Sequence, residues 1–117
     1  MRKTITWFSR HDPTPRQRAE LERLFPGAAI TIDRRTFRDA DDIIARHRGD
    51  EMVVVAPLSV IQALVDRGIR PLWPEMEKIP PGAAAEVTMR RRDGRLDHYR
   101  FVQFRRVVSI EIRFEEV

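Results

Sequence analysis

Residues 52–56 constrain the fold of this chain most, because they form the uninterrupted apolar run Met-Val-Val-Val-Ala. A strand with one face in water alternates apolar and polar side chains, whereas a strand covered on both faces is apolar throughout. We therefore predict that 52–56 is the central strand of a sheet with helices on both faces.

Strands and helices alternate around this run. Residues 4–9 and 28–33 are rich in β-branched and aromatic side chains and end in polar clusters, which predicts two strands before the central one. A short fourth strand is predicted over 69–73. The three intervals between successive predicted strands have the apolar periodicity of helices.

The helix starts are marked by capping signals. Thr14 supplies an N-cap hydroxyl, Pro15 suits the first helical position, and Gln17 completes a capping box. The second helix is indicated by aspartates at its start and basic residues at its end. Ser59, with Gln62 three residues on, is a candidate cap of the third helix, and it could instead donate to a ligand there.

This alternation predicts an α/β fold, a Rossmann-like three-layer sandwich with parallel core strands joined by right-handed crossovers. The βαβαβαβ core occupies residues 1–75, and antiparallel strands over 82–117 form a C-terminal hairpin extension. With 117 residues, the chain has the size of a single domain over 1–117.

The antiparallel third is predicted from alternating segments. A proline-bounded connector covers 75–82, and Asp93-Gly94 is a strong signal for a two-residue hairpin turn. The strands flanking this turn, and a last one after them, are predicted over 85–92, 96–103 and 107–114.

Composition limits the compartment and the partners. The chain has no cysteine, no secretion signal and no membrane-spanning run, which makes a cytoplasmic protein the expectation. A net charge of +4 arises almost entirely from arginine, with 20 Arg against 2 Lys. Arginine suits phosphate and carboxylate partners, although genome composition or life at high temperature explains the same bias equally well.

Ser9, Arg10 and His11 form the main candidate site. Ligands of open parallel sheets bind beyond the carboxyl ends of the strands, and these residues follow the first strand. A hydroxyl, a guanidinium and an imidazole together could bind an anion and move protons, so we assign the three as candidate catalytic residues. An ordinary exposed loop explains the same composition equally well.

Other strand ends supply candidate ligand-binding residues, for which solvated or structural roles are the competing interpretation. They are Arg34, Arg35, Thr36, Pro57, Ser59 and Trp73.

Cofactor and polymer sites are weakly indicated. The three histidines are dispersed, and the dinucleotide and P-loop glycine motifs are absent, so we expect no metal and no cofactor. The arginines of 90–106, interleaved with aromatic residues, are compatible with nucleic-acid binding. Neighbouring acidic residues and the usual charging of edge strands favour a solvated surface.

The segment Ile5-Thr6-Trp7-Phe8-Ser9-Arg10-His11, followed by Thr14-Pro15-Arg16-Gln17, resembles the start of the small CRISPR-associated ring nucleases of type III loci. In that family a first strand ends in a Ser-His or Ser-Arg-His element before a Thr-Pro-capped helix. The larger CARF-type sensors have a similar Rossmann-like core. The motif covers about 17 residues, and the order of elements about 75.

The resemblance implies an antiviral enzyme that binds a cyclic oligoadenylate and cleaves it without metal by attack of a ribose 2′-hydroxyl. A nearly symmetric ring would favour a homodimer. The alternative is a non-catalytic nucleotide sensor or a protein-interaction module.

Overall fold

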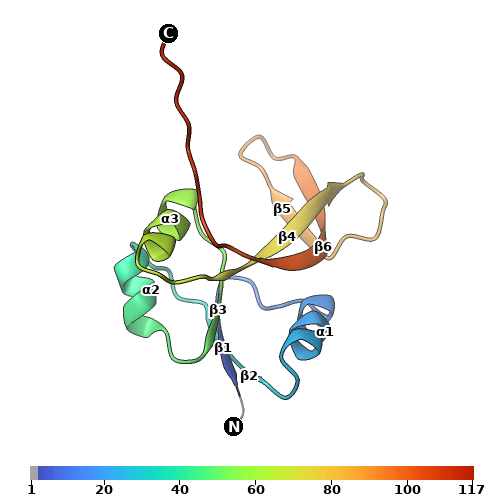
Figure 1. Ribbon diagram of the computed structural model, residues 1–117. Helices are drawn as coiled ribbons and strands as arrows, with labels where there is room; N and C mark the ends of the chain where they lie inside the picture. Colours follow the sequence, from blue (N-terminus) through green and yellow to red (C-terminus); the bar gives the residue numbers. More distant parts are fainter. Residues whose placement is uncertain (1–2) are drawn as a thin grey trace.

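The computed structural model describes residues 3–117 and has an α/β fold, in which three helices accompany one mixed six-stranded sheet (Figure 1). The strands are β1 (Thr4–Phe8), β2 (Ala29–Asp33), β3 (Glu51–Val54), β4 (Leu72–Ile79), β5 (Val87–Arg90) and β6 (Leu96–Arg106). The helices are α1 (Pro15–Leu24), α2 (Ala40–Arg46) and α3 (Leu58–Asp66).

The strand order is β2-β1-β3-β4-β6-β5. The first four strands are parallel, and the last two pair antiparallel, β6 with β4 and β5 with β6. The parallel core and the antiparallel hairpin predicted from the sequence are thus confirmed.

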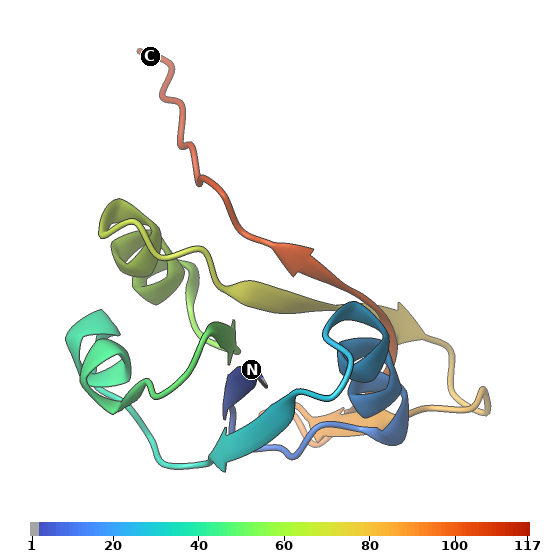
Figure 2. The ribbon, with the colours of Figure 1, turned by 60° about the horizontal axis from the view of Figure 1, so that its bottom comes forward.

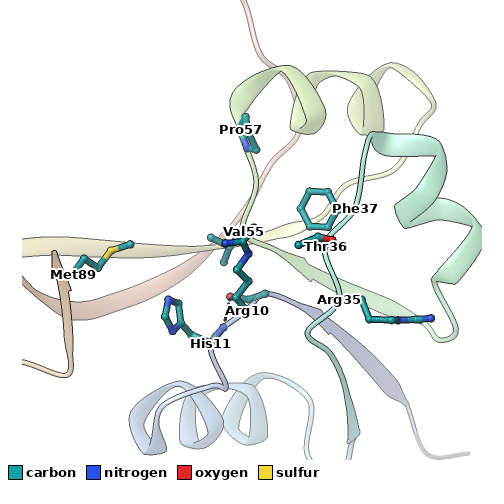
Figure 3. A pocket seen from close by; sticks show the side chains of 9 residues that line it. Arg10, His11, Arg35, Thr36, Phe37, Val55, Pro57 and Met89 are labelled. Atoms are coloured by element: carbon teal, nitrogen blue, oxygen red, sulfur yellow. Dashed lines mark hydrogen bonds between the residues drawn. The ribbon is translucent and has the colours of Figure 1, made fainter. Parts of the chain in front are cut away.

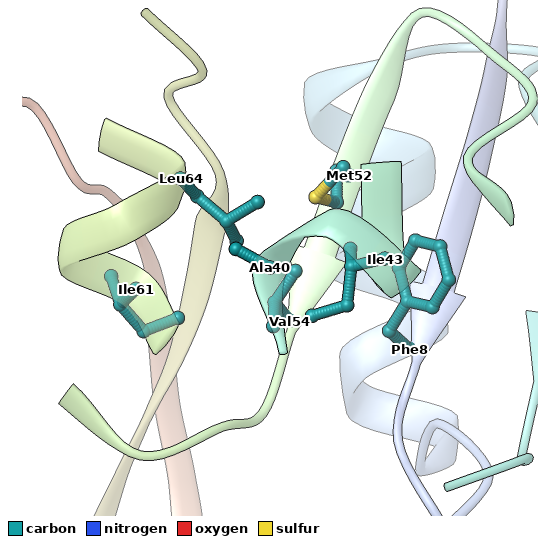
Figure 4. Packing of buried hydrophobic residues seen from close by; sticks show 7 residues of the cluster. All are labelled: Phe8, Ala40, Ile43, Met52, Val54, Ile61 and Leu64. Carbon is teal, nitrogen blue, oxygen red and sulfur yellow. The ribbon is translucent and has the colours of Figure 1, made fainter. Parts of the chain in front are cut away.

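Successive side chains of β1 and β3 enter two different cores, as the pleat of a strand requires. Phe8, Met52 and Val54 pack with residues of α2 and α3, in the cluster shown in Figure 4. Ile5, Trp7 and Val53 pack on the other side with Leu21 of α1 and with Leu72. In Figure 1, α1 accordingly lies across the strands from α2 and α3. The apolar run at 52–56 reflects this burial on both faces of β3.

The predicted cap of α1 is present, and an aspartate caps α2 at its predicted acidic start. Thr14 accepts a hydrogen bond from the Gln17 backbone N–H, and the Gln17 side chain accepts one from the Thr14 backbone N–H. Asp39 caps α2 through the backbone N–H of Asp42. The predicted cap of α3 is wrong, because Pro57 occupies the N-cap position and Ser59 lies inside the helix.

The predicted fourth strand is present with different bounds, and the predicted connector over 75–82 is wrong. A single strand, β4, runs through Pro74 to Ile79. Proline is tolerated here because β4 pairs with β3 only at Leu72, so the edge beyond that residue is free. A register shift between Glu75 and Met76 follows the proline.

The hairpin turn is longer than predicted. Arg91 donates its backbone N–H to the Arg95 carbonyl, which leaves a three-residue loop over 92–94. Gly94 alone among these residues has a positive φ, of 87°, as in a type I turn closed by a glycine bulge.

The predicted strand at 107–114 is wrong for the isolated chain. Residues 107–117 form no strand and extend away from the sheet (Figures 1 and 2). The alternating pattern is present, but β6 already pairs with β4 and β5, and 107–117 joins no strand. Separately, no helix over residues 3–117 is long and apolar enough to cross a membrane.

Candidate functional site

A cavity of about 430 Å³ opens where the strand order reverses. Strand β2 lies on one side of β1 and β3 on the other, and ligands of open α/β sheets bind at such a switch point. Three strand ends and one hairpin residue line it, as Figure 3 shows: Ser9, Arg10, His11, Arg35, Thr36, Phe37, Val55, Pro57 and Met89. The structure therefore brings the three candidate catalytic residues to one cavity.

The loop after β1 is held by hydrogen bonds to its backbone. The indole Nε1–H of Trp7 donates to the His11 carbonyl over 2.8 Å. The His11 backbone N–H donates to Ser9 Oγ over 3.2 Å. The Ser9 N–H donates to the carbonyl of Asp33, at the end of β2. Backbone bonds thus position the loop and leave the side chains of Arg10 and His11 to other partners.

Arg10 is the cation available in this cavity. Within residues 3–117 its guanidinium makes no ion pair and no hydrogen bond, and it is exposed to solvent. In Figure 3 the side chain extends toward Val55, at the end of β3. His11 is also exposed, while Ser9 as a residue is nearly buried at 9% exposure. A positive charge, an imidazole and a hydroxyl therefore meet within one concave surface.

Arg34 and Arg35 are each held by a carboxylate. Arg34 binds Asp12 through two hydrogen bonds and does not line the cavity. This bond lowers the pKa of Asp12. Arg35 binds Asp33 in the same forked way and points away from the cavity centre in Figure 3. Both arginines are therefore less available to an anion than Arg10.

Asp33 organises the end of β2. It accepts from Arg35 at 2.7 and 3.1 Å and from Arg46 of α2 at 3.4 Å. The hydrogen bonds from Arg35 lower the pKa of Asp33, and burial opposes this shift. The charge of Arg46 lowers the pKa of Asp33 further. The carboxylate therefore joins the loop after β2 to α2.

The remaining candidate residues do not all lie at the same cavity. Thr36 and Pro57 line the cavity, Ser59 is exposed outside it, and Trp73 lies in an adjoining one. The adjoining cavity, of about 250 Å³, shares Ser9, His11, Val55 and Met89 with the first. Its walls also include Trp7, Met76 and Val87, so it is mainly apolar.

Sequence reasoning missed Phe37, Val55 and Met89 as lining residues. Val55 follows β3 directly, and Phe37 lies in the loop after β2, so the strand-end rule could have included both. Met89 lies in β5 and reaches the cavity only because the hairpin folds back over the carboxyl ends of the core strands. No local signal could have identified it.

Most arginines of the hairpin are neutralised within the chain. Arg91 pairs with Asp97, whose pKa is lowered mainly by Lys78 and also by Arg91. The other ion pairs are Arg95 with Asp93, Arg100 with Glu77, Arg105 with Glu75 and Arg106 with Glu51. This surface has the paired charges of a solvated strand edge, which agrees with the interpretation favoured from the sequence.

The other two histidines lie away from the cavity. His47 caps the end of α2 beside Phe8, and His98 contacts Thr88 Oγ1 within the hairpin. Among residues 3–117, no three acidic or histidine side chains are grouped closely enough to hold a metal ion.

Comparisons of the chain with protein-family models, curated proteins and solved structures gave no match. The geometry and chemistry of the cavity are therefore the basis of the functional proposal.

Proposed function

We propose that this protein is a Rossmann-like ring nuclease that binds a cyclic oligoadenylate at the strand-end cavity and opens it without metal. The observation that supports this most is the unpaired Arg10 guanidinium beside His11 and Ser9, in a cavity at the switch point of the sheet. An exposed fork of N–H donors matches a phosphodiester, which needs two adjacent donors and a positive charge.

The proposed reaction uses groups that the cavity offers. The ribose 2′-oxygen bonds to the adjacent phosphorus while the bond from phosphorus to the 5′-oxygen breaks. His11 takes the proton of the 2′-hydroxyl and returns it to the leaving 5′-oxygen. Arg10 stabilises the charge on the non-bridging oxygens, and the Ser9 hydroxyl donates a hydrogen bond to one of them. The product is a linear chain with a 2′,3′-cyclic phosphate and a free 5′-hydroxyl.

The adjoining apolar cavity suits an adenine. Trp73 is 42% exposed, so its ring is accessible for stacking, and Met76 and Met89 provide polarisable contacts beside it. Phosphate and base would then occupy neighbouring cavities that share His11 and Ser9.

The size of the cavity supports a two-fold assembly. A volume of about 430 Å³ is near the lower end of the roughly 300–1,000 Å³ typical of small-ligand sites. A cyclic oligoadenylate has several nucleotides, so one cavity holds only part of the ring. A homodimer would present two such cavities to a nearly symmetric ligand.

The test is incubation of the purified protein with cyclic tetra-adenylate or hexa-adenylate in a chelator, followed by chromatography and mass spectrometry. We expect the linear 2′,3′-cyclic phosphate product. His11→Ala should lower the rate by roughly 10²–10⁴-fold. Arg10→Ala should lower it by about 10²-fold or more.

Arg92→Ala is the matched control, because Arg92 is an exposed arginine outside both cavities. Full activity of both cavity variants would contradict the assigned residues. Ring binding without turnover would contradict the enzyme and favour the nucleotide sensor. Neither binding nor turnover would leave the protein-interaction module as the better explanation.

A further inference from the structure

Residues 107–117 have the pattern of a strand but pair with no strand in the described part of the chain, residues 3–117. Val108, Ile110, Ile112 and Phe114 alternate with Ser109, Glu111 and Arg113. Ile112 is 71% exposed and Phe114 92% exposed, which is unusual for large apolar side chains on an alternating segment. Figure 2 shows this segment extending away from the sheet.

The start of the segment is anchored to the body of the chain. The Val107 backbone N–H donates to the Pro71 carbonyl over 2.9 Å. Val107 and Ile110 pack against the core cluster under α2 and α3. The apolar face at Ile110 is thus directed toward the chain's own core, while both backbone edges beyond it are open to another strand.

We infer that residues 107–117 pair antiparallel with the same segment of a second copy, about a two-fold axis through Ile112. A two-fold axis perpendicular to the strands relates each strand to the other in the antiparallel sense. This inference rests on the segment alone and does not depend on the proposed ligand.

Charge and apolar pairing together select this register from its neighbours. With the axis at Ile112, Glu111 lies opposite Arg113 of the second copy, and the reciprocal pair forms at the other side. An axis at Glu111 or at Arg113 would place like charges opposite each other, which is destabilising. An axis at Ile110 would place Glu111 opposite Ser109 and form no cross-strand charge pair. An axis at Phe114 would also form a charge pair, Arg113 with Glu115, but it would place Ile112 opposite Glu116. An axis between two residues would place apolar side chains opposite polar ones.

In the same register, Ile112 and Phe114 face apolar side chains of the second copy. Ile112 lies opposite its own counterpart, and Phe114 of the second copy lies opposite Ile110. Directly opposite residues project from the same face of a ribbon. Phe114 of each copy would therefore lie on the face of the ribbon on which Ile110 of the other copy contacts its own core cluster. Within residues 3–117, Glu111 and Arg113 form an ion pair with each other at 3.5 Å, and both side chains remain largely exposed.

The first test is the mass of the protein in solution, by chromatography with light scattering across a dilution series. We expect a dimer for the native sequence. Arg113→Glu should shift the species to the monomer, because two acidic side chains then face each other. The double variant Glu111→Arg/Arg113→Glu should restore the dimer. A monomeric native protein, or a dimer unaffected by Arg113→Glu, would overturn the inference.

A second test determines the register by disulfide cross-linking. Introduced cysteines are easy to interpret because the chain has no cysteine of its own. Ile112→Cys should form an intermolecular disulfide on mild oxidation, since directly opposite Cα atoms are roughly 4.5–5.5 Å apart. Phe114→Cys is the matched control. It is at least as exposed, but its two copies would be about 13 Å apart along the ribbon. Equal cross-linking of the two variants would show random collision and contradict the register.

Discussion

The indole Nε1–H of Trp7 donates a hydrogen bond of 2.8 Å to the carbonyl oxygen of His11. Trp7 is buried in β1 and its ring meets Phe104 edge to face, with centroids 6.2 Å apart. A core side chain thus holds the backbone of a cavity residue, so the position of His11 depends on the packing beneath it.

We therefore predict that Trp7→Phe weakens both the fold and the site. Loss of this hydrogen bond should lower the free energy of unfolding by about 1 kcal/mol, in addition to any loss from repacking. Ring binding or turnover should fall as the loop over 9–11 loosens. Urea unfolding and the cleavage assay measure the two effects. Phe104→Leu is the control, because it removes the aromatic contact and keeps the bond to His11; similar loss of turnover in both variants would point to packing alone.

The capping box of α1 should be measurable in the same way. Thr14→Ala removes the acceptor of the Gln17 backbone N–H. We expect a loss of about 0.5–2 kcal/mol in the free energy of unfolding, and a smaller loss in Thr14→Ser, which keeps the hydroxyl. Denaturant titration distinguishes the variants. If alanine and serine were equivalent, the hydroxyl would not contribute to stability.

Gly49 should resist substitution for a steric reason. Its φ is 150°, and a Cβ at this position would lie 2.7 Å from Thr4 Oγ1 and 3.0 Å from the Thr4 carbonyl oxygen. Gly49→Ala should destabilise the fold by about 1–3 kcal/mol. Gly68→Ala separates the causes, because Gly68 also has a positive φ but a Cβ there would meet no atom within 4 Å. Equal losses in thermal or urea unfolding would mean that backbone conformation, and not Thr4, sets the cost.

Stability should also depend on the protonation of His47. Burial lowers its pKa from the usual 6.5, and within residues 3–117 its Nδ1 has no hydrogen-bond partner. Below pH 6.5 the unfolded chain binds a proton at this histidine that the folded chain resists, so the free energy of unfolding should fall as the pH drops through this value.

Urea unfolding at about pH 5 and about pH 8 tests the pH dependence. His47→Gln should reduce the difference between the two conditions. His98→Gln, a change within the hairpin, should leave the difference in place. A pH dependence unchanged in His47→Gln would assign it to another group.

Local signals predicted much of the fold because they act over a few residues. The capping residues Thr14 and Asp39 mark helix starts through bonds to backbone groups three residues away. The same logic failed at Ser59, since Pro57 occupies the N-cap position and α3 begins directly after it. Pro74 predicts a strand end, but its missing N–H matters only where a second strand would need it.

The candidate site was predicted in part for a similar reason. Ser9, Arg10 and His11 follow β1, and a parallel sheet brings its strand ends to one edge, so their place at the cavity followed from the order of elements. The roles of the other arginines could not be predicted. Arg34 is paired by Asp12, 22 positions earlier, and among residues 3–117 Arg10 has no such partner.

The sequence by itself determined the alternation of strands and helices, the cap of α1 and the polar ends of the first three strands, because periodicity and capping depend on near neighbours. Only the tertiary structure decided the strand order, the path of β4 through Pro74, the approach of Met89 and the ion pairs that leave Arg10 free within residues 3–117. These features depend on contacts between residues far apart in the chain. The energies of these contacts depend on the three-dimensional arrangement of the residues, which local sequence patterns do not specify.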